Sequence, residues 1–138
     1  MSRSGYTDDC DGWSLIMWRG AVASAIRGAR GQQFLKEMLG ALDAMPEQKL
    51  IAHELEADGA VCAIGAVGKA RGLKMDGIDP EDRETVASIF GIAPALVAEI
   101  VFMNDEENYW SKETPDARYE RMRKWIVAQI KPSIGTSL

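Results

Sequence analysis

Cys62 and His53 are the two residues of this sequence whose side chains suit nucleophilic catalysis. Cys62 begins a run of small residues that predicts a short helix, and a cysteine at a helix N-terminus has a lowered pKa that favours the thiolate. His53 could act as the base, and Asn104 or Asp105 could orient it. Together they would supply the nucleophile, base and orienting group of a cysteine-dependent hydrolase or transferase.

The same residues have a structural interpretation. Cys62 stands among Val61, Ala63 and Ile64, and a cysteine in such a setting is commonly a small buried hydrophobic residue. His53 is the single histidine of the chain, and a lone histidine is more often a surface or structural residue than a base. We prefer this interpretation, favour no catalytic residue, and keep catalysis as the alternative.

A second candidate site is a polar segment that combines acids with aromatic residues. Its candidate partner-binding residues are Glu106, Glu107, Tyr109, Trp110 and Glu113. Exposed acids speed association with a basic protein, and tyrosine and tryptophan supply contact area. The aromatic residues could equally hold the segment against the fold, so an interface and a structural loop both remain open.

Neither a metal nor a cofactor is expected. Asp8, Asp9 and Asp11 precede Gly12, but Trp18 stands where a calcium-binding loop requires glutamate. We therefore interpret the three aspartates as a solvated acidic arm.

Direct binding to nucleic acid is not expected either. The 138-residue chain carries a net charge of −5, whereas a general nucleic-acid binder presents a basic face. An acid-free stretch holds residues that could contact phosphates and bases, although an amphipathic helix explains them better: Arg19, Arg27, Arg30, Trp13 and Trp18. Residues 80–90 and 94–104 have helix-turn-helix proportions, but the second segment lacks Arg or Lys to reach base edges.

Cysteine content and hydropathy indicate a cytoplasmic protein. Cys10 and Cys62 are too few for a disulfide scaffold of this size, so we expect both to be reduced. The N-terminal residues lack the apolar segment of a signal peptide. The longest apolar stretch, residues 13–26, is too short and too polar to cross a membrane. The oligomeric state stays open.

The periodicity of apolar residues predicts a mainly α fold of five or six helices in one compact domain. We expect a polar arm at 1–12, a globular domain at 13–131 and a tail at 132–138. Helix signals place the helices at 13–27, 32–44, 63–71, 80–90, 94–104 and 115–131, with Gly28 and Gly31 as the break between the first two. Asp79 and Thr114 are the expected N-caps of the fourth and last helices, and Trp125 and Ile126 are expected in the core.

Residues 50–64 are open to two interpretations. Asp58-Gly59 is a hairpin turn signal, which favours short strands at 50–56 and 60–62. A continuous helix is the alternative, although Gly59 in its interior would cost about 1 kcal/mol.

The order of these motifs resembles a loose group of small uncharacterised phage and bacterial proteins. The shared features are Cys-Ala-Ile-Gly-Ala from Cys62, then Asn104-Asp105, then a helix that starts at Thr114-Pro115, over about residues 50–130. The resemblance implies no known reaction, and it implies that Cys62, Gly65, Asn104 and Asp105 form the centre of the fold. It also implies an accessory protein that binds a host protein and inhibits a defence or nucleic-acid-processing system.

Overall fold

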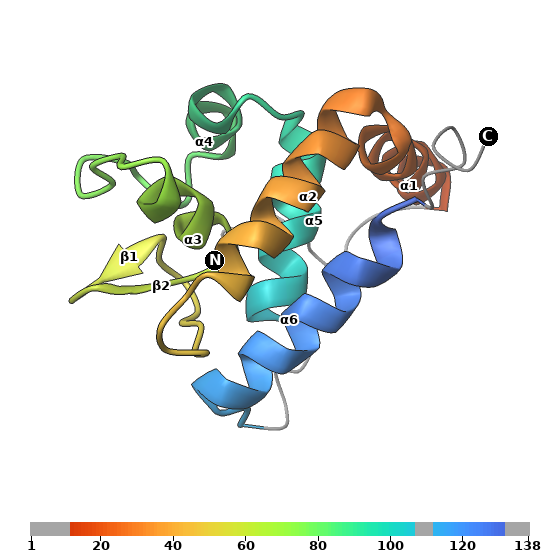
Figure 1. Ribbon diagram of the computed structural model, residues 1–138. Coiled ribbons are helices and arrows are strands. Elements are labelled where there is room, and N and C mark those ends of the chain that lie inside the picture. The colour runs from red at the N-terminus through yellow and green to blue at the C-terminus, as the bar shows by residue number, and fades with distance from the viewer. Residues whose placement is uncertain (1–11, 107–111, 132–138) are drawn as a thin grey trace.

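The chain folds into a mainly α structure with one two-stranded antiparallel sheet, as predicted (Figure 1). The computed structural model describes residues 12–106 and 112–131. Its elements are α1 (Gly12–Arg27), α2 (Ala29–Asp43), β1 (Glu56–Ala57), β2 (Ala60–Val61), α3 (Ala63–Ala70), α4 (Arg83–Phe90), α5 (Pro94–Asp105) and α6 (Pro115–Gln129).

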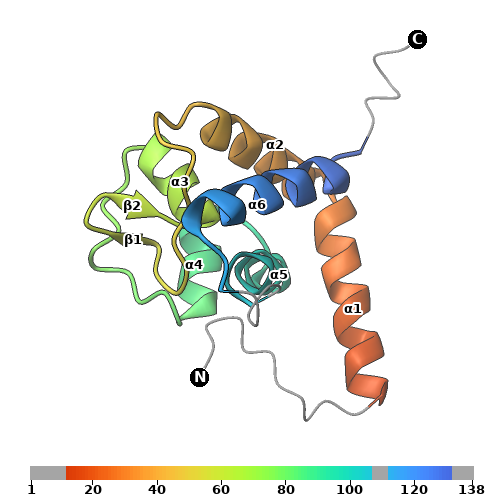
Figure 2. The same cartoon turned by 90° about the horizontal axis from the view of Figure 1, so that it is seen from below.

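Helix α5 is the centre of the packing. It contacts α1, α3, α4 and α6, and residues 95–101 are all buried (Figure 2). A helix that is apolar on nearly every side is stable only when other elements surround it. For the same reason α5 has no free face to insert into a DNA groove, although α4 and α5 have the lengths of a helix-turn-helix.

No single helix within residues 12–106 and 112–131 is long and apolar enough to cross a membrane. Helices α4 and α5 reach that length and hydropathy only as a pair, which is bent by 106°.

The second helix begins earlier than the glycines of the sequence suggest. We expected Gly28 and Gly31 to break the chain and the helix to start at 32, but α2 starts at Ala29 with Gly28 as its N-cap. Gly31 lies inside α2, and the position requires glycine because a Cβ there would stand 1.8 Å from the carbonyl oxygen of Ala25. The glycine therefore allows α1 and α2 to meet closely at their corner.

The hairpin prediction is confirmed. Asp58 and Gly59 have φ angles of 52° and 84°, the left-handed pair that a tight hairpin turn requires, and Glu56 pairs with Val61. The strands are only two residues long, shorter than the predicted 50–56 and 60–62. Residues 50–55 do not continue the regular ladder: the N–H of Leu50 donates to the carbonyl of Pro115 at 3.2 Å, whereas Ile51 and Leu55 still bond to Val61 and Cys62 at 2.9 and 3.2 Å.

Two of the predicted helix starts can be compared with the structure. Thr114 caps α6, since its Oγ1 accepts a hydrogen bond from the N–H of Ala117 at 3.2 Å. Asp79 as the cap of α4 is wrong, because α4 is capped by Asp82, whose carboxylate accepts from the N–H of Thr85 at 3.2 Å. Asp79 instead accepts from the N–H of Glu81 at 2.9 Å in the turn before the helix.

The buried core joins α2, α3, α5 and α6. On α6, Tyr119, Met122 and Ile126 are fully buried, and the Tyr119 hydroxyl donates to the carbonyl of Leu42 at 2.6 Å. Burial raises the pKa of Tyr119 above its ordinary value, because the ionised phenol is poorly solvated there. Trp125 was expected in the core but is only partly buried against it.

Gly65 provides a test of the packing between α3 and the hairpin. A Cβ at this position would lie 1.9 Å from the carbonyl oxygen of Leu55, which accepts the hydrogen bond from the N–H of Cys62. Gly65→Ala should therefore lower the free energy of unfolding by about 3 kcal/mol, near the top of ordinary overpacking penalties.

The matched control is Gly40→Ala on α2, where an added Cβ meets nothing within 4 Å. It should raise the free energy of unfolding by about 0.5–1 kcal/mol through helix propensity alone. Urea unfolding monitored by circular dichroism measures both. Equal stability of the two variants would show that α3 does not pack on Leu55 as described.

Candidate functional site

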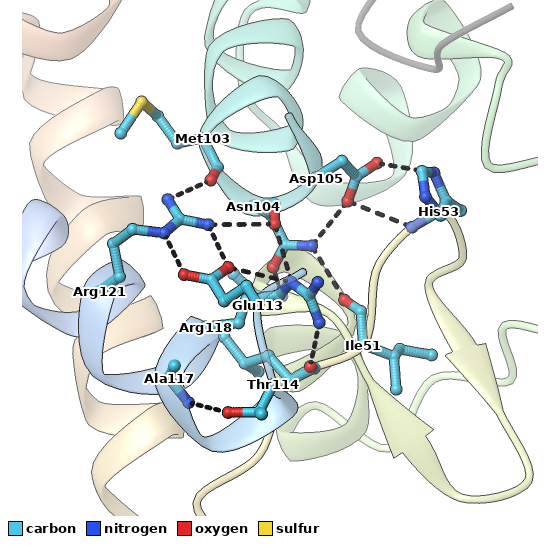
Figure 3. Close-up of polar contacts among 12 residues, drawn as sticks. Ile51, His53, Met103, Asn104, Asp105, Glu113, Thr114, Ala117, Arg118 and Arg121 are labelled. Atoms are coloured by element: carbon cyan, nitrogen blue, oxygen red, sulfur yellow. Dashed lines mark hydrogen bonds and ion pairs between the residues drawn. The ribbon is translucent and has the colours of Figure 1, made fainter. Parts of the chain in front are cut away.

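Charged and amide side chains converge where α5 ends, beside residues 50–53 and the first turns of α6 (Figure 3). We call this group the polar cluster: Asn104, Asp105, Glu113, Arg118 and Arg121. It contains two of the residues that the sequence marked as orienting groups and one that it marked as partner-binding.

Asn104 binds three parts of the chain at once. Its Oδ1 accepts from the N–H of Ala63 at 3.2 Å, and its Nδ2 donates to the carbonyl of Ile51 at 2.9 Å and to Asp105 Oδ1 at 2.7 Å. The residue is 1% exposed. A buried amide with these partners is well satisfied, and it holds the start of α3 and the 50–53 segment against α5.

Asp105 lies beside His53, as the catalytic alternative required. Its Oδ1 accepts from the backbone N–H of His53 at 3.2 Å, while its Oδ2 is 3.9 Å from the ring Nδ1, too far for a hydrogen bond (Figure 3). The Asp105 side chain is 1% exposed and that of His53 is 69% exposed. His53 has a φ of 73°, so the carboxylate holds a backbone conformation that non-glycine residues rarely adopt.

Two arginines of α6 occupy the C-terminal end of α5. Arg118 Nε donates to the carbonyl of Asn104 at 3.1 Å, and Arg121 donates to the carbonyl of Met103 at 2.5 Å. Arg118 also reaches the carbonyl of Leu50 at 3.0 Å. The last carbonyls of a helix lack partners within the helix and carry partial negative charge, so cationic donors stabilise them.

Glu113 forms ion pairs with both arginines. Its carboxylate accepts from Arg121 Nε at 2.6 Å and from a second Arg121 nitrogen at 2.8 Å, and it lies 3.6 Å from Arg118 Nε. The Glu113 side chain is 5% exposed. The Glu113 carboxylate is therefore enclosed in an ion pair rather than exposed, and its contact with a partner stays a prediction.

The remaining residues of the acidic and aromatic segment are only partly placed. Glu106 is half-buried at the end of α5. Glu107, Tyr109 and Trp110 lie outside the described residues, so their part in an interface stays a prediction.

Cys62 caps α3, as expected from its position. Its Sγ accepts from the N–H of Gly65 at 3.3 Å, and the residue is 1% exposed within the core. The structure therefore brings His53, Asn104 and Asp105 together. The residue after Cys62, Ala63, donates its N–H to Asn104, whereas the described bond of the Cys62 thiol is to Gly65. Of the proposed base and nucleophile, the His53 side chain is exposed and the Cys62 thiol is enclosed. An enclosed thiol is poorly placed to attack a substrate.

The arginines of the polar cluster are the residues that sequence reasoning missed. Arg118 and Arg121 are three positions apart and so share one side of α6. That spacing, on the helix that follows the buried one in the chain, is the signal that could have found them. Across residues 12–106 and 112–131, no three His, Cys, Asp or Glu side chains group in a way that could hold a metal ion.

Asn104→Asp tests the polar cluster with the smallest change of shape. The new carboxylate would lose the donor to Ile51 and stand beside Asp105, so the free energy of unfolding should fall by about 3–5 kcal/mol at pH 7. Burial and the neighbouring charge raise the pKa of the new carboxyl in the fold, so its protonation returns stability as the pH falls through that raised value. Denaturant unfolding at pH 7 and pH 5 measures the difference.

Exchanging the two residues, Asn104→Asp with Asp105→Asn, is the control. It removes the repulsion between carboxylates and should recover part of the loss at pH 7. If Asn104→Asp lost the same free energy of unfolding at pH 7 and pH 5, or lost none, the polar cluster as described would be contradicted.

Comparison with known proteins adds no further information on this site. The chain matches no family model, no curated protein and no solved structure. What the site does must therefore be inferred from its own geometry. In the described part of the chain, that geometry is a polar cluster whose bonds mostly hold the backbone.

Proposed function

We propose that this chain is a small acidic accessory protein, of the kind that phages encode, which binds a host protein and thereby inhibits it. Its target would be an enzyme with a basic surface, such as a nucleic-acid-processing or defence enzyme in the bacterial cytoplasm. The distribution of charge on the folded chain is the observation that carries this proposal.

One stretch of the chain combines many exposed acids with few bases. Residues 54–84 hold eight acids and four bases, a net charge of −4, and every one of the acids is exposed. We call these acids the acidic surface: Glu54, Glu56, Asp58, Asp76, Asp79, Glu81, Asp82 and Glu84. In both views the hairpin and the α3–α4 connection lie on the same side of the molecule (Figures 1 and 2).

Of the four bases in this stretch, Lys69 and Lys74 are exposed among the acids, and Lys69 donates to the carbonyl of Gly59 at 2.9 Å. The other two are held by groups outside the stretch. Arg71 is bound by Glu37 of α2, at 2.7 Å for both pairs of atoms, and this bond lowers the pKa of the Glu37 carboxyl. Arg83 is half-buried and lies over the ring of Trp18, 5.4 Å from its centroid. An acidic side of this kind complements a partner whose surface is basic because it binds nucleic acid, and it raises the rate of association.

Charge reversal on the acidic surface tests the proposal. Glu54→Lys with Glu81→Lys changes two exposed acids for which no bond to the backbone is described, so the fold should be unaffected. Association with the partner should slow by about tenfold at low salt, and the difference should shrink at high salt. The partner is first captured from a bacterial extract on the immobilised chain, and its binding is then measured by biolayer interferometry.

The control carries the same change in charge through Glu47→Lys with Glu120→Lys, two exposed acids outside the acidic surface. It should bind within about twofold of the parent. An equal loss of association rate in both variants would show that net charge, and not the acidic surface, determines binding. Full binding by the Glu54 and Glu81 variant, or no captured partner, would count against the proposed function.

Catalysis by Cys62 and His53 is the second candidate, and the contact between His53 and Asp105 favours it. In a Cys10→Ser background, iodoacetamide should modify folded Cys62 at least about a hundredfold more slowly than the unfolded chain, because reaction requires local opening of the core. Intact mass against time gives both rates. Rapid modification of the folded protein below pH 8 would replace the binding proposal with the catalytic one.

A further inference from the structure

The dipeptide Asp-Gly occurs twice among the described residues, and the fold holds the two pairs in different ways. Asp58-Gly59 forms the turn of the hairpin, whereas Asp76-Gly77 lies in the connection between α3 and α4 (Figure 1). All four residues are exposed. Because the two pairs are chemically identical, a difference in their reactivity must come from the structure around them.

An aspartic acid that precedes glycine can react with its own backbone. The glycine nitrogen attacks Cγ of the aspartic acid, so that a C–N bond forms, the Cγ–OH bond breaks, and the amide proton and the hydroxyl leave as water. One water molecule then opens the cyclic succinimide at either of its carbonyls. Opening at the backbone carbonyl gives isoaspartate, in which the main chain runs through the former side chain. Glycine favours the attack because it has no Cβ beside the nitrogen.

The Asp76-Gly77 pair has the freedom that this attack requires. A Cβ at Gly77 would meet nothing within 4 Å, and no described group accepts a hydrogen bond from the Gly77 N–H. Among the described residues, the turn is closed by one backbone hydrogen bond, from the N–H of Ile78 to the carbonyl of Met75 at 3.1 Å. A single bond of this kind contributes little net stability, so the turn opens readily.

The Asp58-Gly59 pair is held on both sides. The φ angle of Asp58 is 52°, and the neighbouring residues Ala57 and Ala60 are paired in the ladder. The carbonyl of Gly59 also accepts from Lys69 Nζ at 2.9 Å, which ties the turn to α3. Rotation of the Asp58 backbone towards its own carboxyl group would break these contacts, so the Gly59 nitrogen is kept from Cγ.

We propose that Asp76 is a site of spontaneous isomerisation to isoaspartate through a succinimide with the Gly77 nitrogen, and that the hairpin protects Asp58 from the same reaction. An intramolecular attack is fast only when the reacting atoms can reach a near-attack geometry. The open turn at Asp76 allows this geometry and the hairpin does not. Water is the co-reactant, and the reaction involves no change of oxidation state.

The product would change both charge position and packing at this turn. Isoaspartate at 76 carries its carboxylate directly on Cα and adds one methylene to the main chain between Met75 and Ile78. Met75 is buried and Ile78 packs against the core, so the longer connection must be absorbed by the exposed turn between them. Asp76 belongs to the acidic surface, but the reaction does not depend on what that surface binds.

Incorporation of heavy oxygen tests the proposal on the full chain. The folded protein is kept at neutral pH in water enriched in heavy oxygen, and each opening of a succinimide leaves one heavy oxygen in the chain. Trypsin places the two pairs in separate peptides, residues 50–69 and 75–83. The mass of peptide 75–83 should rise at least about tenfold faster than that of peptide 50–69, because only the turn at Asp76 opens readily.

Two controls assign the label. In urea, where neither turn is formed, both peptides should gain heavy oxygen at rates within about threefold of each other. Gly77→Ala, which the open surroundings accept at a φ that is not positive, should slow labelling of peptide 75–83 in the folded chain by at least about tenfold, because the methyl group crowds the nitrogen.

Equal rates in the two peptides of the folded chain would overturn the proposal, as would an unlabelled peptide 75–83. Labelling that persists in Gly77→Ala would show that the oxygen enters at another acid of the peptide and would overturn it as well. Asp79 precedes a proline, whose nitrogen has no proton to lose, and Asp82 is held by Thr85 at 2.7 Å.

Discussion

The side-chain amide of Asn104 is the interaction on which the arrangement of the other elements depends. It is the point at which α5, the 50–53 segment and the start of α3 are joined, and two of its three partners are backbone groups. An apolar core of this kind could pack its helices in several ways, whereas a buried amide accepts only the arrangement that satisfies its donors and acceptor. The guanidinium groups of Arg118 and Arg121 extend the same constraint to α6.

The elements with strong local signals could be predicted from the sequence. Asp58-Gly59 favours a hairpin turn regardless of its surroundings, and Thr114-Pro115 starts a helix in the same way. Asp79 was mistaken for a cap because Asp79 and Asp82 carry the same local signal, and only the packing of α4 selects Asp82. Gly31 was read as a break because the approach of Ala25 that requires it is a tertiary contact.

The site was harder to predict for the same reason. An acid in a polar segment can be a solvated charge or one partner of an ion pair. Glu113 forms ion pairs because the carbonyls at the end of α5 orient Arg118 and Arg121 towards it. Cys62 at a helix start suggests a reactive thiol, and only its burial shows that the capping position has a structural use. Local residue types therefore indicated where the polar groups would gather, and the tertiary structure decided how they are used.

The bonds of Asn104 also bear on the order in which the chain folds. They join residues separated by 41 and 53 positions, so each closes a long loop and cannot form before most of the chain has collapsed. The hairpin and the isolated helix turns involve near neighbours and form on much shorter timescales. We expect the amide to be docked after the rate-limiting barrier, which makes it a determinant of how long the folded state lasts rather than of how fast it is reached.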